Sequence, residues 1–527
     1  MLRSVWVGGL ATDVCLTEGE GPRPAVLIRT PYDRRRHRAE LRAWAARGFV
    51  GVGQDVRGRY ASEGDWRPYR SEAADGAATL AWIRAQEWSD GRVVAVGASY
   101  AAHCALAPLL EEEAGEVPDA VVAAVPALGG AEVAREPSGV ERLSPRVGWW
   151  LTHGDRADSD EEAFARALRD TPGLLDRLPV RKMLPQASWP DVWTARRDDG
   201  LWARAACARV PLLAVGGSRD PFADETIRLW RSWGGAARLL LGPWGHGLTT
   251  TPAPEAHAEH HLDLGELYAR WARKALAATL RGRRGALALG GSAHWCDAAT
   301  IGPAAPGFGP DIGPDTRTDT RPDTDAGPGA RTDRPHRVAR PLAYRFGHSA
   351  GLRLVHGADF LADPRRPVRS DRLDIDEHAA PDRCLLVTPP LPRPLDLLGD
   401  AEARLVAAAE GRSADWAVRL VALRPDGRAQ PLATGVARAD HGGPDPRPVT
   451  VPLGHLARRL PAGIRLRVEV AGHHFPAHVR NPHTGQDPVT ATRLLPSRRS
   501  VRTADSVLLL PAVHRPALID PVQEILR

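Results

Sequence analysis

Cysteine, lysine and long apolar runs are all scarce in this sequence. The cysteines are scattered and never stand at CxxC spacing, so they indicate neither a disulfide framework nor a zinc site; they are Cys15, Cys104, Cys207, Cys296 and Cys384. No apolar run is long enough to span a bilayer, and the N-terminus lacks the pattern of a secretory signal. We therefore expect a cytoplasmic protein that does not enter a membrane.

Lysine is scarce, but positive charge is not, because arginine supplies almost all of it. Of the 70 basic residues only Lys182 and Lys274 are not arginine, and the formal net charge is +6 at pH 7. The arginines are interspersed with Asp and Glu along the whole chain, without the clustered basic stripe that nucleic-acid binding needs. We expect a small-molecule partner, no nucleic acid and no membrane, and we leave self-association into a homo-oligomer open.

The hydrophobic pattern divides the 527-residue chain into segments. Residues 1–128 alternate continuous apolar runs with helical stretches, which is typical of a parallel sheet buried on both faces. The strand signal stops over 129–205, where the segments look helical, and it returns over 206–302. We therefore predict an α/β domain in two parts, 1–128 and 206–302, with a helical cap inserted over 129–205.

The rest of the chain changes character twice. Residues 303–340 form a low-complexity tract of Pro, Gly, Asp, Thr and Arg that can bury almost nothing, and we predict a disordered linker there. Residues 341–527 show short apolar runs separated by turn signals, a spacing that predicts an antiparallel β-sandwich.

A candidate nucleophile stands in the stretch RVVAVGASYAAHCALAP, residues 92–108. A run of β-branched residues leads into Gly97 and Ser99, and an alanine-rich helical stretch follows. Ser99 therefore lies either on a strand-to-helix turn that exposes its hydroxyl or at a helix start as an ordinary N-cap. The window alone does not decide between these interpretations, because short motifs match by chance.

Two further polar residues follow predicted strands of the same domain. VPLLAVGG is followed by SRDPF, which contains Asp220, and ARLLLGPW is followed by GHG, which contains His246. In open parallel sheets functional residues lie just past the carboxyl ends of strands, and the order Ser, Asp, His is that of α/β-hydrolases. Taken alone, Asp220 is better explained as a helix cap, and His246 as one of many loop histidines; the required order of three strand-end residues favours the catalytic interpretation.

Longer motifs carry a family resemblance. LIRTPYDR, QDVRGRYASEGDW, AWIRAQEWSDGRVVAVGASY, LLAVGGSRDPF and LLGPWGH resemble segments of the CocE/NonD family of serine hydrolases, a group that includes cocaine esterase, X-Pro dipeptidyl peptidases and α-amino acid ester hydrolases. Towards the C-terminus, VTPPLPRPLDLLGDAEARL, FPAHVRNPHTG and SVLLLP resemble the jelly-roll domain of the family. The resemblance implies an α/β-hydrolase fold with a short helical cap insertion and a C-terminal jelly-roll β-sandwich domain.

The resemblance also implies roles for individual residues. It assigns Ser99 as the nucleophile, Asp220 as the acid and His246 as the base, and it implies an oxyanion hole made by the Tyr32 phenol and the backbone N–H of Tyr100. A hydroxyl becomes a good nucleophile when a neutral imidazole takes its proton, and a carboxylate holds that imidazole in the right tautomer. We expect no cofactor and no metal.

The expected function is that of a serine hydrolase that cleaves a small ester or amide through an acyl-enzyme intermediate. An X-Pro-type peptidase stays open as an alternative, and it would need an acidic site for a free α-amino group, supplied by Glu161 or Glu162 of the cap. The alternative from another class is a non-catalytic ligand-binding protein on a relic hydrolase fold. Such a relic would be free to lose Ser99, Asp220 and His246, and this chain retains them.

Four smaller features complete the expectations. We interpret Asp55 and Arg57 as a structural ion pair that braces a turn. The histidines of HAEHH, residues 257–261, match no metal-binding pattern and are expected on a solvated face. The family usually has glycine where this chain has Ala102, so the helix after Ser99 must accommodate one more methyl group. The tryptophans of the cap either form its core or line a wall for the substrate; they are Trp149, Trp150, Trp189, Trp193 and Trp202.

Overall fold

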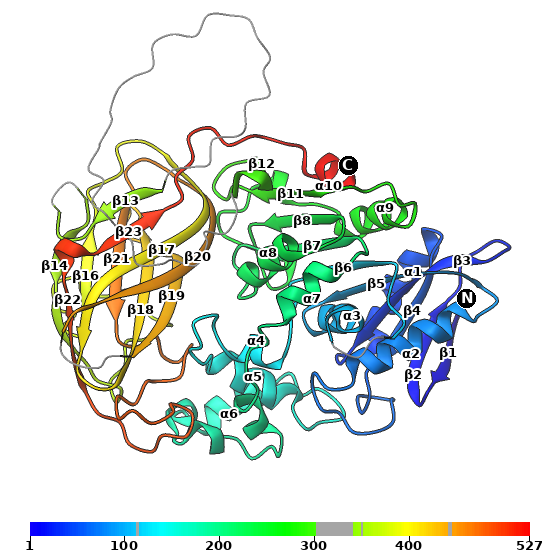
Figure 1. The fold of residues 1–527 in the computed structure, drawn as a ribbon, viewed down its shortest axis with the longest axis horizontal. Helices are drawn as coiled ribbons and strands as arrows, with labels where there is room; N and C mark the ends of the chain where they lie inside the picture. The colour runs from blue at the N-terminus through cyan, green and yellow to red at the C-terminus, as the bar shows by residue number, and fades with distance from the viewer. Residues whose placement is uncertain (112–114, 302–340, 349–350, 441–444) are drawn as a thin grey trace, which may run out of the picture.

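The molecule has an α/β lobe and a β-sandwich lobe, with a small helical cap packed against both (Figure 1). A computed structural model describes residues 1–111, 115–301, 341–348, 351–440 and 445–527. The linker predicted over 303–340 lies outside these described residues. Within them, no helix has both the length and the apolar character needed to cross a membrane.

A mixed sheet forms the centre of the α/β lobe. In spatial order its strands are β1 (Leu2–Val7), β2 (Leu10–Cys15), β4 (Val50–Asp55), β3 (Arg23–Thr30), β5 (Ser89–Ala98), β6 (Ala120–Ala124), β7 (Leu212–Gly217), β8 (Ala237–Gly242), β11 (Arg283–Ala288) and β12 (Trp295–Asp297). From β4 to β11 in this order all neighbours are parallel. The β1–β2 hairpin and β12 join the two ends of this parallel part in antiparallel pairs.

Helices cover both faces of this sheet. One face is covered by α1 (Arg38–Ala46), α9 (Leu264–Leu276) and α10 (Pro521–Leu526), and the other by α2 (Glu72–Arg84), α3 (Tyr100–Leu110), α7 (Leu201–Cys207) and α8 (Ala223–Ser232). Within β5, Val94 and Val96 pack towards the first group and Ala95 towards the second, because successive side chains of a strand point to opposite faces. The parallel sheet expected from the continuous apolar runs is confirmed, and so is the α/β-hydrolase fold that the family resemblance implies.

Two antiparallel sheets form the second lobe. One holds β13 (Leu342–Arg345), β23 (Val507–Leu510), β17 (Leu395–Ala409), β22 (Ser497–Val501) and β15 (Asp359–Ala362), with β20 (Arg447–Leu460) also paired to β17; the other holds β14 (Arg353–His356), β16 (Arg383–Val387), β21 (Arg465–Ala471), β18 (Ser413–Leu423) and β19 (Ala429–Asp440). Their inner faces enclose one apolar core that includes Leu405, Trp416 and Val468. The expected C-terminal β-sandwich is confirmed.

The cap is built partly on the sandwich lobe. It contains α4 (Gly130–Ala134), α5 (Ser144–His153), α6 (Ala163–Asp170) and short 3-10 turns. Phe475 and Val479, from the segment after β21, are buried in the same apolar cluster as Trp150 of the cap. Leu143 N also donates a hydrogen bond to Ala477 O at 2.8 Å. The helical insertion therefore contacts both lobes rather than standing free on the α/β sheet.

The end of the chain returns to the α/β lobe. Leu518 forms a β-bridge with Cys296 in β12, and α10 packs on β11, where Glu524 accepts a hydrogen bond from Arg284 at 3.0 Å. Figure 1 shows this red C-terminal helix beside the green β11 and α9. The segment after β23 thus connects the two lobes, although the sequence placed residues 341–527 together in one β domain.

Candidate active site

Ser99 lies on the turn between β5 and α3. Its backbone has φ 57° and ψ −122°, and positive φ is uncommon for residues other than glycine. Gly97 allows the turn, because a Cβ there would lie 2.1 Å from the carbonyl oxygen of Ala101. The Ser99 side chain caps no N–H of α3. The geometry is therefore that of a strained turn that presents a hydroxyl, not that of an ordinary N-cap.

The methyl group of Ala102 fits without disturbing this turn. Ala102 is fully buried and belongs to the apolar cluster that joins α3 to the sheet, where Ala95 and Val121 are its neighbours in the cluster. The alanine that replaces the usual glycine of the family is therefore accommodated in the core beneath the helix.

Asp220 and His246 meet just beyond the ends of β7 and β8. Asp220 Oδ1 lies 2.6 Å from His246 Nδ1, and Asp220 Oδ2 accepts a hydrogen bond from Phe222 N at 3.2 Å. The Asp220 side chain is completely buried, whereas 46% of the His246 side chain is exposed. Because Nδ1 is bound to the carboxylate, Nε2 remains as the nitrogen that can exchange a proton with a bound molecule.

Close backbone packing brings this pair together. Arg219 N donates a hydrogen bond to the carbonyl oxygen of Trp244 at 2.9 Å, which places the loop after β8 across the end of β7. A Cβ on Gly217 would lie 2.2 Å from the same oxygen. Glycine at the end of β7 is therefore needed for Asp220 and His246 to lie side by side.

The nucleophile candidate and the acid–base pair lie at one edge of the sheet. Ser99 follows β5, Asp220 follows β7 and His246 comes after β8, and these strands lie within the consecutive set β5-β6-β7-β8. The carboxyl ends of parallel strands share an edge, which is where such folds place their functional groups. The structure thus brings Asp220 into contact with His246 and places Ser99 on the same edge of the sheet.

The Tyr32 phenol lies beside the side chain of Ser99. Tyr32 comes just after β3, and its hydroxyl accepts a hydrogen bond from Trp149 Nε1 at 3.2 Å. Burial raises the pKa of the Tyr32 phenol, and hydrogen bonding with Trp149 and Ser99 offsets part of that rise. The phenol therefore keeps its proton at neutral pH and can donate it to an oxygen held at Ser99. Nothing in the sequence singled out Trp149 among the tryptophans of the cap.

Tyr100 is fixed by its side chain and contributes through its backbone. Its hydroxyl accepts a hydrogen bond from Tyr69 N at 2.7 Å and is also bonded to the carboxyl group of Glu72. Burial raises the pKa of both Tyr100 and Glu72. Its own N–H opens α3, and the first N–H groups of a helix have no acceptor within that helix. The phenol thus anchors the helix start while the N–H is available next to Ser99.

The interpretation of Asp55 and Arg57 as a mutual ion pair is wrong. Asp55 is fully buried and binds Arg34, whose Nη1 lies 2.6 Å from Asp55 Oδ2. Arg57 binds Asp75 of α2, with Nε donating to Oδ2 at 3.1 Å. The strand β4 ends at Asp55 and the chain turns before Arg57, so the two side chains diverge to different partners.

The tryptophans of the cap divide between the two expected roles. Three lie in the apolar core of the cap, namely Trp150, Trp189 and Trp193. Trp149 instead lies nearly parallel to the ring of Tyr100, with centroids 6.1 Å apart, and donates to Tyr32. Trp202 belongs to neither set and packs against the Arg228 guanidinium at 4.0 Å.

The histidines of residues 257–261 follow the expectation only in part. His257 and His261 are exposed, but His260 is buried, and its Nε2 lies 3.3 Å from the carbonyl oxygen of His294. In the described part of the chain, no set of three or more His, Cys, Asp or Glu side chains is grouped as metal ligands would be.

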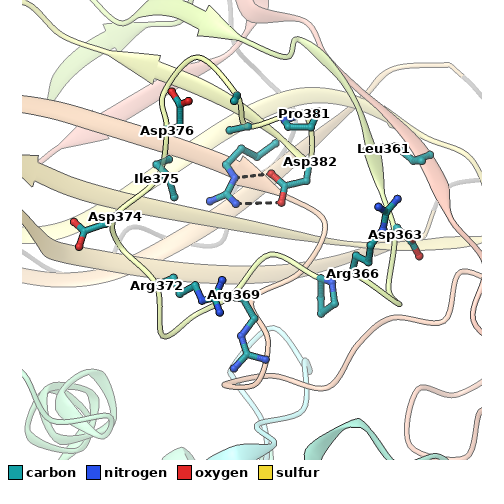
Figure 2. A pocket seen from close by; sticks show the side chains of 14 residues that line it. Leu361, Asp363, Arg366, Arg369, Arg372, Asp374, Ile375, Asp376, Pro381 and Asp382 are labelled. Atoms are coloured by element: carbon teal, nitrogen blue, oxygen red, sulfur yellow. Dashed lines mark hydrogen bonds and ion pairs between the residues drawn. The ribbon is translucent and has the colours of Figure 1, made fainter. Parts of the chain in front are cut away.

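A hollow in the sandwich lobe is lined by the segment 361–383 (Figure 2). Its lining holds arginine, aspartate, proline and aliphatic side chains but no serine, cysteine or histidine. Arg383 donates to Asp382 at 2.8 Å and to Glu469 at 2.8 Å, so that its charge is already compensated. The chemistry of a hydrolase therefore points to the edge of the α/β sheet rather than to this hollow.

Two family models match the chain. The model described as X-Pro dipeptidyl-peptidase (S15 family) matches residues 9–248, and the model described as X-Pro dipeptidyl-peptidase C-terminal non-catalytic domain matches residues 325–511. Cocaine esterase from Rhodococcus sp. (strain MB1 Bresler) is 24% identical over 542 residues, which cover 90% of this chain and 90% of the esterase.

Solved structures resemble the molecule over nearly its whole length. An aminopeptidase from a marine sediment Thaumarchaeota archaeon has a TM-score of 0.71 at 20% identity, covering 97% of this chain and 96% of that one. An α-amino acid ester hydrolase has a TM-score of 0.67 at 18% identity, covering 97% and 96%. A CocE/NonD family hydrolase from Staphylococcus aureus has a TM-score of 0.61 at 12% identity, covering 97% and 93%. At these identities the likeness establishes a shared fold.

Proposed function

Since this chain belongs to the CocE/NonD family of serine hydrolases, we propose that it cleaves a small ester or amide through an acyl-enzyme formed on Ser99. The observation that carries the proposal is the positive-φ turn at Ser99 with the Tyr32 phenol beside its side chain. The Asp220–His246 pair at the same edge of the sheet would supply the base and the group that orients it.

In this mechanism His246 moves the proton at each step. Its Nε2 takes the hydroxyl proton as Ser99 Oγ attacks the substrate carbonyl, and it then gives that proton to the leaving group. In the second half its Nε2 takes a proton from water as the water oxygen attacks the acyl carbon. It then returns that proton to Ser99 Oγ as the acyl–oxygen bond breaks and the acid product leaves. Asp220 accepts the Nδ1–H throughout and stabilises the imidazolium that forms twice in each cycle.

The negative charge that develops on the carbonyl oxygen would be stabilised by two donors. They are the O–H of Tyr32 and the backbone N–H of Tyr100, which would both donate to that oxygen. Donors already in position are worth more than water because they need no reorganisation at the moment of reaction. Trp149 donates to the Tyr32 oxygen, and this polarises the phenol so that its own O–H becomes a better donor.

The X-Pro alternative loses the residues on which it depended. Glu161 and Glu162 are both exposed, and Glu161 forms an ion pair with the equally exposed Arg36 at 3.2 Å. Glu162 stands at the start of α6. Neither carboxylate is buried near Ser99, where an α-amino group next to the scissile bond would have to be held.

Labelling with a fluorophosphonate tests the nucleophile directly. We expect one adduct in the wild-type protein, located at Ser99 by peptide mass spectrometry, and none in Ser99→Ala. A panel of aryl esters, amino-acid esters and X-Pro amides, ranked by kcat/KM, then identifies the preferred bond. An adduct at another residue, or ester hydrolysis that survives Ser99→Ala, would contradict the proposal.

A further inference from the structure

Arg146 in α5 is a buried cation to which the described residues of the protein offer no partner. Only 8% of the residue is exposed, and its Nε is buried without a hydrogen-bond partner. Throughout the described ranges, no carboxylate lies within ion-pair distance of this guanidinium and no group is hydrogen-bonded to it. Arginine keeps its charge in proteins, and a buried charge without a partner is unfavourable. The arrangement therefore calls for an anion that the described residues do not supply.

The face of α5 that carries Arg146 is turned towards Tyr32. Trp149, three residues further along, donates to the Tyr32 hydroxyl, and the ring of His153, seven residues along, lies 5.0 Å from the Tyr32 ring. Residues at these spacings share one face of a helix. Burial raises the pKa of the phenols of Tyr32 and Tyr69, and the charge of Arg146 opposes that rise in both. The guanidinium thus lies on the side of the cap that faces Ser99.

Arg142, four residues earlier, is a buried arginine that is paired with carboxylates, as is expected of a cation with a structural role. It is 7% exposed and donates to both oxygens of Glu136, at 2.9 and 2.8 Å. A second carboxylate is also near, because Glu225 Oε1 lies 3.8 Å from Arg142 Nη2. Within the described part of the chain, two carboxylates thus lie at Arg142 and none at Arg146, which indicates that Arg146 is not there to hold the cap together.

We propose that Arg146 binds a carboxylate of the substrate, so that this hydrolase prefers esters or amides that carry a negative charge. The inference rests on the proposed function, because it takes the substrate to react at Ser99. The planar guanidinium fork suits a carboxylate, to which it can donate two parallel hydrogen bonds. The neighbouring charge that acts on Arg146 is the positive Arg142, so an anion would enter without opposition from a nearby carboxylate.

Substrate pairs that differ by one charge test this proposal. The pair of 4-acetoxybenzoate and its methyl ester varies the leaving group, and the pair of mono-4-nitrophenyl adipate and its methyl ester varies the acyl group. We expect wild type, after correction for intrinsic reactivity, to prefer the charged member of at least one pair. Arg146→Met should reduce that preference roughly 10- to 100-fold, the scale of a hydrogen-bonded contact with a charged group.

Two further variants serve as controls. Arg146→Lys keeps the charge but loses the fork, so it should keep part of the preference that Arg146→Met loses. Arg166→Met removes an exposed arginine of the same cap, one that is paired with Asp160, and should leave the preference unchanged. An equal loss in Arg166→Met would show that the overall field of the cap attracts anions, and this would overturn a binding role for Arg146.

Calorimetry separates this inference from the proposed function. Benzoate and adipate are titrated into Ser99→Ala, which lacks the nucleophile, so that binding is measured without hydrolysis. We expect binding to Ser99→Ala and none to the double variant that also carries Arg146→Met. If Ser99→Ala still hydrolyses esters, the proposed function fails, whereas Arg146-dependent binding of the carboxylates would survive. If Arg146→Met unfolds, the wild-type preference and the Arg146→Lys variant decide. Wild type without any preference, or equal losses on both members of each pair, overturns the inference.

Discussion

Two clusters of side chains where the cap meets the rest of the molecule differ in how their polar groups are paired. We call them the reaction-side cluster, made of Ser99, Tyr32, Trp149 and Arg146, and the junction cluster, made of Glu136, Arg142, Glu225 and His478. In the junction cluster Glu136 accepts hydrogen bonds from Arg142 and lies 2.8 Å from His478 Nε2 of the sandwich lobe. In the reaction-side cluster the guanidinium of Arg146 has no partner among the described residues, and burial raises the pKa of the Tyr32 phenol so that it keeps its proton.

The contrast separates groups that hold the molecule together from groups that are available to a substrate. Burial alone would lower the pKa of Arg142, but Glu136 and Glu225 outweigh it and raise that pKa. Burial lowers the pKa of Arg146, and no carboxylate reverses the effect. We therefore expect changes in the reaction-side cluster to alter rates with little effect on stability, and changes in the junction cluster to do the reverse.

The largest expected effect is that of Ser99→Ala in the reaction-side cluster. Loss of one part-exposed hydroxyl should leave the melting temperature unchanged, while kcat for a neutral aryl ester should fall by about 10⁴-fold or more, as for members of a triad that act as a unit. Steady-state kinetics and calorimetry on the same preparation measure both quantities. A large drop in melting temperature would show that Ser99 also stabilises the fold, and this would contradict the division between groups for stability and groups for reaction.

Tyr32→Phe should give the next largest effect. The substitution keeps the ring and its packing but removes one oxyanion donor, which costs about 3 to 4 kcal/mol, or on the order of 10² to 10³ in kcat. KM should change much less, because the hydrogen bond strengthens only as charge develops on the oxygen. Single-turnover kinetics with an ester whose acylation is rate-limiting provide the measurement.

A matched control exists for this tyrosine. Tyr268 in α9 has a buried hydroxyl that bonds to none of the residues the structure describes, and Tyr268→Phe should leave kcat unchanged and stability equal or slightly higher. If Tyr32→Phe retained kcat within about twofold of wild type, Tyr32 would not be an oxyanion donor, and the reaction-side cluster would lose its central member.

Glu136→Gln should break the junction cluster. Burial opposes ionisation of Glu136, but Arg142 and His478 outweigh it and hold the pKa of Glu136 below its usual range. Removing one member of a buried pair leaves the other charge uncompensated, which costs about 3 kcal/mol of unfolding free energy. Denaturant unfolding measures the loss, and kcat on a neutral ester should stay near wild type because Glu136 pairs with Arg142 and His478 rather than with Ser99 or His246.

The control for this variant is Glu161→Gln. Glu161 forms an ion pair with Arg36 in which both side chains are more than half exposed, and such pairs contribute about 0 to 1 kcal/mol. A Glu136→Gln protein as stable as Glu161→Gln would mean that the junction cluster does not hold the cap against the sandwich lobe.

The sequence predicted Ser99 and Tyr32 of the reaction-side cluster, together with the Asp220–His246 pair, but none of the ion pairs of the junction cluster. Ser99, Asp220 and His246 stand directly after strands, and the fold of a parallel sheet alone determines that strand ends share an edge. Tyr32 was indicated by the TPYD segment, through family resemblance. These positions depend on local sequence and on one topological rule, which is why they can be located without a structure.

Ion pairs are harder, because pairing depends on which surfaces meet. Among 68 arginines no pattern marks Arg146 as one to which the described residues offer no carboxylate, and two residues of spacing made Asp55 and Arg57 look like partners although each binds a residue elsewhere. The junction between Glu136 and His478 joins residues 342 positions apart. Only the packing of the cap on the sandwich lobe brings them together, and hydrophobic periodicity does not encode that packing.

The smallest expected effect concerns how the junction cluster responds to pH. Burial raises the pKa of Glu225 to about 7, although Arg142 and Arg197 lie 3.8 and 3.7 Å from its carboxylate. An unfolded glutamate titrates near 4.3, so between about pH 4.5 and 7 the folded protein keeps a proton that the unfolded chain has released. The free energy of unfolding therefore falls as pH rises through this window and levels off above it.

Glu225→Gln is neutral at every pH and should remove this contribution. The melting temperature should then fall less between pH 5 and pH 8 in the variant than in wild type, by the equivalent of about 1 to 3 kcal/mol. Differential scanning calorimetry at the two pH values measures the difference, with the exposed Glu161→Gln as the reference for a glutamate that does not contribute. If Glu225→Gln and wild type lose stability in parallel, Glu225 is ionised in the folded protein, and Arg142 and Arg197 hold it as a charged partner. That result would make the difference between the two clusters larger. Both carboxylates of the junction cluster would then be charged and paired, whereas Arg146 of the reaction-side cluster would have no anionic partner among the described residues.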